Sequence, residues 1–231
     1  METPEQTLRG VLQTIENAAK LAGRPSAVRL LAVSKTRTAG EVRALAAAGQ
    51  LAFGENYVRE GMAKAEELAA LGLEWHLIGH LQSNKCREAA AAFDWVQSLD
   101  RPKLVAALDR ARPPGRPPLN VLVQVNPDGE AGKSGCAPGD VGALAALVAA
   151  APNLRLRGLM AIPEPHPDPA RRRDTFRSLR AMFDRLAADY PGVDTLSMGM
   201  SDDFEAAIAE GATMVRIGTM LFGPRTAPAR D

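Results

Sequence analysis

The chain has 231 residues, of which 46% are hydrophobic and 24% are charged, and its formal net charge is +1. This balance is typical of a globular protein with a sizeable core, and it gives no basic field for nucleic acid or for an anionic membrane. We therefore expect small molecules as partners, with no nucleic acid and no membrane.

After an amphipathic helix over residues 4–21, short apolar segments alternate with alanine-rich helical segments. The expected strands are Val28–Ser34, Leu51–Gly54, Glu74–Gly79, Trp95–Leu99, Asn120–Val125, Arg155–Ile162, Thr195–Met198 and Met214–Ile217. The expected helices are Ala39–Ala48, Val58–Ala70, Asn84–Ala92, Pro102–Ala111, Gly139–Ala150, Arg171–Ala188 and Asp202–Glu210. This order predicts an α/β fold, a single (β/α)₈ TIM barrel with an extra N-terminal helix. An open doubly wound sheet has the same alternation, but eight regular units without a long insertion favour the barrel.

The chain is expected to form one domain over residues 1–231, with its core at about 5–224 and a flexible C-terminal tail. Its two cysteines, Cys86 and Cys136, stand in no CxxC or metal-ligand spacing, which favours free thiols in a reducing compartment. The first residues lack the basic start and apolar run of a signal peptide, and no apolar stretch is long enough to span a bilayer. We expect a cytoplasmic protein and, without a specific motif to support it, a monomer.

Lys35 stands at the end of the first strand, where a barrel presents its reactive groups. By the two-residue alternation of a strand, Leu31, Val33 and Lys35 share the face that fills the barrel. Apolar walls disfavour the ammonium form, so they favour the free amine that attacks an aldehyde. The alternative is a lysine that extends from the end of the sheet to water.

The segments after strands seven and eight are where barrels often bind phosphate. Ser201 follows strand seven as a candidate N-cap of the next helix, whose backbone N–H groups could receive an anion. After strand eight, Gly218 permits close approach of the backbone and Thr219 offers a hydroxyl. Each residue could have a purely structural role, but their occurrence at both strands favours a phosphate site.

Arg216 lies within the last strand and shares a face with Met214 and Gly218 by alternation. It is therefore expected to point into the barrel. The alternative is an arginine paired with a carboxylate at the rim.

Five motifs together resemble the YggS-like family, also called the pyridoxal 5′-phosphate (PLP) homeostasis protein family. The resemblance covers about residues 5–224. The motifs are Val33-Ser34-Lys35-Thr36, Phe53-Gly54-Glu55-Asn56, Trp75 to Lys85, Leu196 to Asp203 and Val215-Arg216-Ile217-Gly218-Thr219.

The resemblance implies a barrel similar to the N-terminal domain of alanine racemase, which binds PLP and serves intracellular PLP supply and amino-acid and keto-acid balance without evident turnover. It also implies the residue roles. Lys35 would form the Schiff base and Arg216 would face the pyridine nitrogen, where a donor makes the ring a weaker electron sink. The other cofactor-binding residues implied are Ser201, Gly218 and Thr219 at the phosphate, Asn56 beside the cofactor and Met198 near the phosphate end.

Several other polar residues have both a functional and a structural interpretation. Lys133 ends a Gly-Lys-Ser sequence that fails the nucleotide-loop pattern, because proline stands where the first glycine is needed, and it is either near a ligand or solvated. Lys85 is a hypothetical second lysine that contacts or transfers PLP. His76 is interpreted as a hydrogen-bonded structural histidine, and the three histidines are too scattered to form a metal site.

Three functions remain open at this stage. The first is a PLP carrier or regulator that hands the cofactor to PLP-requiring apo-enzymes or buffers its aldehyde. The second is a PLP enzyme such as an amino-acid racemase, although racemases take an acid–base tyrosine from an additional domain that this sequence does not suggest. The third is a class I aldolase-like barrel, which would use Lys35 on a phosphorylated sugar equally well and is disfavoured only by the motifs.

Overall fold

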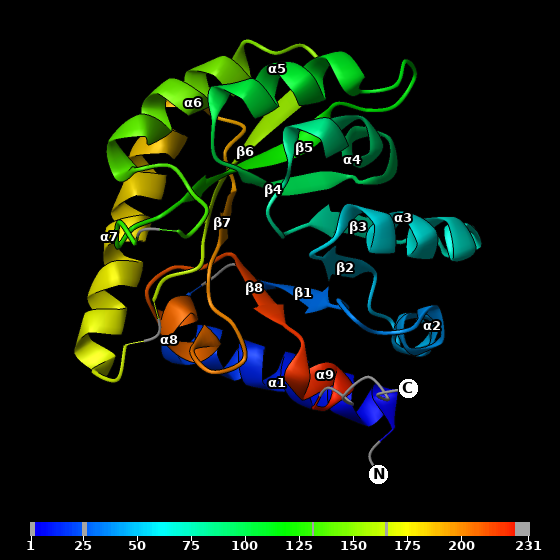
Figure 1. Cartoon of the computed structure of the whole chain (residues 1–231). Helices are drawn as coiled ribbons and strands as arrows, with labels where there is room; N and C mark the ends of the chain where they lie inside the picture. Colours follow the sequence, from blue (N-terminus) through cyan, green and yellow to red (C-terminus); the bar gives the residue numbers. More distant parts are fainter. Residues whose placement is uncertain (1–2, 25–26, 131, 165, 225–231) are drawn as a thin grey trace.

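A computed structural model of the chain describes residues 3–24, 27–130, 132–164 and 166–224. Eight parallel strands form a closed barrel in which each strand pairs with the next along the chain and β8 pairs with β1 (Figure 1). The strands are β1 Arg29–Val33, β2 Ala52–Glu55, β3 Glu74–Leu77, β4 Trp95–Leu99, β5 Leu119–Val125, β6 Leu154–Ala161, β7 Thr195–Ser197 and β8 Met214–Ile217. The predicted barrel is thus confirmed, and the open doubly wound sheet is excluded. Residues 225–231 of the predicted flexible tail lie outside the described residues.

The helices surround the barrel, as Figure 1 shows, and the main apolar core lies between them and the strands. They are α1 Pro4–Leu21, α2 Ala39–Ala47, α3 Val58–Glu67, α4 Cys86–Ala92, α5 Pro102–Ala111, α6 Val141–Ala149, α7 Pro169–Asp189, α8 Phe204–Ala209 and α9 Thr219–Phe222. Capping boxes at Thr3 and Thr38 fix the starts of α1 and α2. The predicted helix from Asn84 begins instead as a 3₁₀ turn at Ser83–Lys85, and α9 was not predicted.

The extra N-terminal helix closes the lower side of the barrel in Figure 1, where α1 packs against α8 and α9. Its apolar stripe includes the buried residues Leu8, Val11 and Ile15 at helical spacing. Helix α1 therefore packs the first described segment of the chain against α8 and α9.

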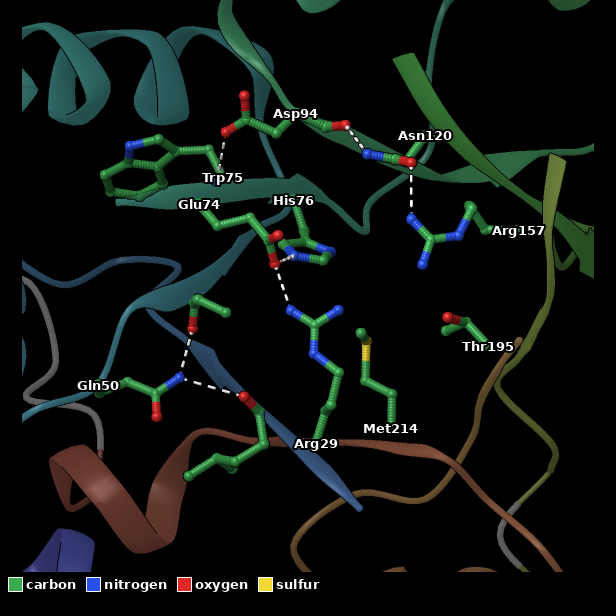
Figure 2. A network of polar contacts seen from close by, with 12 residues as sticks. Arg29, Gln50, Glu74, Trp75, His76, Asp94, Asn120, Arg157, Thr195 and Met214 are labelled. Atoms are coloured by element: carbon green, nitrogen blue, oxygen red, sulfur yellow. Dashed lines mark hydrogen bonds and ion pairs between the residues drawn. The ribbon is translucent and has the colours of Figure 1, made fainter. Parts of the chain in front are cut away.

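Charged side chains fill the barrel end formed by the starts of the strands (Figure 2). Arg29 Nη2 donates to Glu74 Oε1 over 2.6 Å, and His76 Nε2 lies 2.7 Å from the same oxygen. The His76 ring stacks on Trp95 at 5.0 Å between centroids, and the Arg157 guanidinium lies 4.6 Å from the Trp95 ring. Burial lowers the pKa of His76. Burial opposes ionisation of Glu74, but its hydrogen bonds with His76 and Arg29 and the positive charge of Arg29 lower its pKa to about 2.

These pKa shifts predict that the protein loses stability in mild acid. The folded-state pKa of His76 lies below the unfolded value of 6.5, so below that pH the unfolded chain takes up a proton that the folded barrel excludes. Glu74 adds to the loss below 4.5 as the pH falls towards about 2. We expect the free energy of unfolding to fall between about pH 6.5 and pH 5 by at most ~1.4 kcal/mol per pH unit from His76. Urea unfolding of wild type and His76→Phe across this range checks it, and equal slopes would contradict the assignment.

Candidate functional site

A cavity of about 460 Å³ opens at the other end of the barrel, where the strands end. It is lined by Val33, Lys35, Arg37, Asn56, Ile78, Gly79, His80, Gln124, Lys133, Ser134, Ile162, Met200, Ser201, Asp202, Arg216, Gly218 and Thr219. Six of the seven predicted cofactor-binding residues are in this set: Lys35, Asn56, Ser201, Arg216, Gly218 and Thr219. Segments from both ends of the chain thus meet in one site.

Lys35 lies half-buried in the cavity wall, two residues after β1 ends. The alternation argument correctly placed it above Leu31 and Val33, and the alternative of a side chain extended into water does not describe it. The next residue, Thr36, has a φ of 64°, which a β-branched residue rarely adopts. The Thr36 backbone N–H donates to Glu60 Oε1 over 2.5 Å, which holds this unusual turn in place.

A buried ionic cluster supports the loop that carries Lys35. Lys64 Nζ donates to the Ser34 carbonyl over 2.7 Å and to carboxylate oxygens of Glu55 and Glu60 over 2.8 Å each. Ser34 Oγ also donates to Glu55 Oε1 over 2.6 Å. Burial raises the pKa of Glu55, and the contacts of Lys64 and Ser34 oppose that rise. The residues on either side of Lys35 are therefore held by charge-assisted hydrogen bonds.

Arg216 reaches the same cavity from β8 and is only 3% exposed. Its Nη1 donates to the carbonyl oxygen and to Oγ of Ser197 over 2.8 Å each, and its Nη2 donates to the Ala161 carbonyl over 2.8 Å. Burial lowers the pKa of Arg216 to about 10, which Asp203 partly opposes. The prediction that Arg216 points inward is confirmed, and the rim pairing with a carboxylate is not what its hydrogen bonds show.

Ser201 lines the cavity but is not the N-cap of the following helix, so that part of the prediction was wrong. Helix α8 begins at Phe204 with Asp203 as its N-cap residue, and residues 201–203 form a turn before it. The Asp203 carboxylate accepts a hydrogen bond from the Met200 N–H over 2.6 Å, which stabilises this turn. Ser201 therefore lines the cavity as part of a turn and not as the start of a helix.

Met198 is the predicted site residue that the structure does not bring to the cavity. It is fully buried in the apolar core outside the barrel, and Met200 lines the cavity instead. Since Ser197 faces the barrel interior, where it contacts Arg216, alternation turns Met198 to the opposite face.

Other polar residues of the cavity were missed or left undecided. Gln124 lies in β5 two residues after the inward Leu122, so strand alternation could have indicated it. Arg37 follows the turn at residues 35–36 and Ser134 lies in a loop, so neither carries that signal. Lys133 lies in the cavity wall and pairs with Glu130. Lys85 lines a neighbouring cavity with Tyr57 and pairs with Glu88 at 3.0 Å. A half-buried amine, a guanidinium and hydroxyls in one cavity suit a small anionic carbonyl compound.

No helix in the described part of the chain is both long and apolar enough to cross a membrane. The family model "Alanine racemase, N-terminal domain" matches residues 10–226. The chain is 56% identical over 226 residues to the pyridoxal phosphate homeostasis protein of Pseudomonas aeruginosa, with 97% of each chain covered.

Solved structures similar to this barrel include PipY of Synechococcus elongatus and alanine racemase of Corynebacterium glutamicum. PipY of Synechococcus elongatus with PLP bound has a TM-score of 0.78 and 39% identity, covering 90% of this chain and 99% of PipY. Alanine racemase of Corynebacterium glutamicum has a TM-score of 0.61 at 19% identity, covering 95% of this chain and 62% of the racemase, and it shows the fold alone.

Proposed function

Because this chain belongs to the pyridoxal phosphate homeostasis protein family, built on the alanine racemase N-terminal domain, we propose that it binds PLP as a Schiff base on Lys35. In this reaction the lysine amine adds to the aldehyde of PLP, a carbon–nitrogen double bond forms and one water molecule leaves. The observation that carries the proposal is the meeting of Lys35, Arg216, Ser201 and Thr219 in one cavity.

The residues of the cavity fit PLP chemically. Lys35 is half-buried in the cavity wall and carries the primary amine that adds to an aldehyde. Ser201 and Thr219 supply hydroxyl donors for a phosphate, and Gly218 lets the backbone come close. A Cβ at Gly218 would lie 3.2 Å from the Val33 carbonyl oxygen, so a larger residue would press on the end of β1.

Arg216 bears on whether the bound cofactor reacts further. When bound, PLP can act as an electron sink, and this capacity depends on a protonated ring nitrogen. A permanently charged guanidinium facing that nitrogen disfavours its protonation. The three hydrogen bonds described for Arg216 go to neutral oxygens of Ser197 and Ala161. This arrangement favours holding PLP over turning over amino acids.

We infer a role in intracellular PLP homeostasis and amino-acid and keto-acid balance, in which a cytoplasmic, monomeric protein releases PLP to PLP-requiring apo-enzymes. Both cysteines, Cys86 and Cys136, are free and buried, which supports a reducing compartment. The described elements from α1 to α9 all pack on one barrel, which supports a single domain.

The test is loading of the purified chain with PLP. We expect a visible absorbance of the Schiff base and, after borohydride reduction, a pyridoxyl mass adduct on Lys35. Lys35→Ala should lose both signals, because no amine remains at this point of the cavity. The exposed Lys103 of α5 provides the matched control, and Lys103→Ala should load as wild type does.

The competing functions give different results in the same experiment. Trapping of a phosphorylated sugar on Lys35 without a PLP signal would favour the aldolase. Turnover of D- or L-amino acids that disappears in Lys35→Ala would favour a PLP enzyme. A colourless protein with an unmodified Lys35 at saturating PLP would refute the proposal.

A further inference from the structure

A chain of hydrogen bonds runs through the barrel interior from the cavity to the opposite end of the barrel. Arg216 Nη1 donates to Ser197 Oγ over 2.8 Å, and Ser197 Oγ donates to Gln97 Oε1 over 2.7 Å. Gln97 Nε2 lies 2.9 Å from His76 Nδ1, and His76 Nε2 lies 2.7 Å from Glu74 Oε1. Strand β4 pairs with β3 and β5, and β7 pairs with β6 and β8, so the bond from Gln97 to Ser197 crosses the barrel.

The donors and acceptors along this chain have one consistent direction. Glu74 is ionised, so the His76 Nε2 that faces it carries the proton. Neutral His76 then offers Nδ1 as an acceptor to the Gln97 amide, which leaves Gln97 Oε1 to accept from Ser197. The Ser197 hydroxyl in turn accepts from Arg216. Every donor points from Arg216 towards Glu74, so the bond dipoles lie head to tail between a cation and an anion.

Water does not compete for these bonds, because His76, Gln97 and Ser197 are fully buried. Loss of one partner would therefore leave the next group unsatisfied. Stacking on Trp95 fixes the plane of the His76 ring, and Gln97 Nε2 also donates to Met214 Sδ over 3.3 Å. The His76 and Gln97 side chains are thus each fixed by a further contact.

We propose that Ser197, Gln97 and His76 are positioning residues that fix the Arg216 guanidinium in the cavity and balance its charge through Glu74. This inference rests on the proposed function, in which Arg216 faces the ring of PLP. It adds residues from the far end of the barrel to those that determine how tightly the cofactor is held.

The first test measures the dissociation constant for PLP in Ser197→Ala, His76→Phe and the double variant. Each single variant should weaken binding by about tenfold, since each removes one charge-assisted bond and one neutral bond from the same line. If the residues act as a unit, the double variant should also be about tenfold weaker than wild type rather than about a hundredfold. Ser98→Ala is the matched control. Ser98 is a buried serine of β4 that takes no part in this row of hydrogen bonds, and its substitution should leave the dissociation constant unchanged.

A second test needs no cofactor. Nitrogen-15 NMR of the unloaded protein at neutral pH should show His76 protonated on Nε2 alone and separate Nη signals for Arg216, whose rotation is blocked. Ser197→Ala and His76→Phe should merge the Arg216 signals, while Ser98→Ala should not.

The outcomes separate the two proposals. An Nδ1-protonated or doubly protonated His76, or Arg216 signals that stay separate in both variants, would overturn the positioning role whether or not PLP binds. If wild type forms the Lys35 adduct and both variants bind PLP as tightly as wild type, the positioning role fails alone. If wild type binds no PLP, the proposed function fails. The NMR result still decides whether the row of hydrogen bonds through Ser197, Gln97 and His76 fixes Arg216.

Discussion

Lys64→Met should lower the free energy of unfolding by about 3–5 kcal/mol, because it removes one partner of a buried ion pair. Lys64 is 6% exposed and Glu55 is fully buried, so no water replaces the lost ammonium. Glu55 must then take up a proton or remain an uncompensated charge, and the Ser34 carbonyl loses its donor. Urea denaturation at neutral pH measures the loss. Because the loop that carries Lys35 is released, formation of the PLP adduct should also slow.

Two further variants identify the cause of the Lys64 effect. Glu55→Gln in the Lys64→Met background should recover part of the stability, since it removes the buried charge but keeps the acceptor for Ser34. Lys20→Met, in an exposed pair with Glu16 on α1, should change stability by less than about 0.5 kcal/mol. Equal losses for Lys64→Met and Lys20→Met would show that the cluster does not support the fold.

Gly79→Ala should disturb both the fold and the site. A Cβ at Gly79 would lie 2.1 Å from the Asn56 carbonyl oxygen and 2.7 Å from its Cα, so the backbone after β2 must move. Overpacking against backbone costs about 1–3 kcal/mol and sometimes more. Since Asn56 lines the cavity, we expect PLP affinity to fall together with the thermal midpoint. Calorimetry and a PLP titration on the same preparation measure the two effects.

The control for Gly79 is a glycine with space around it. Gly10 lies within α1 and a Cβ there would meet nothing within 4 Å. Gly10→Ala should therefore leave PLP affinity unchanged and raise stability by up to about 1 kcal/mol, because alanine is the better helix former. A Gly79→Ala protein as stable as wild type would mean that the backbone after β2 can move at little cost in free energy.

The fold could be predicted because most strands are short apolar runs and the longer helices have a period close to 3.6 residues. The same alternation placed Lys35 and Arg216 inside the barrel. In β7 the inward Ser197 implies an outward Met198, which therefore lies away from the cavity. Helix α9 has four residues and shows no period to detect.

Turns and long-range contacts account for what the sequence did not indicate. The start of α8 was misplaced because Ser201 and Asp203 are both common N-cap residues and only the turn geometry distinguishes them. The interpretation of His76 as a hydrogen-bonded structural residue is confirmed. Its connection through Gln97 to Ser197 joins strands far apart in the sequence, which periodicity cannot reveal.

The seam between β1 and β8, where Leu31 pairs with Arg216, links the order of protein synthesis to the making of the site. Lys35 is synthesised before β8, which supplies Arg216 and is followed directly by Gly218 and Thr219. A nascent or truncated chain that ends before β8 carries the reactive amine without the opposite wall of the cavity. We therefore expect the protein to retain PLP only after the ring of strands has closed. Retention of the vitamin can then report that folding is complete.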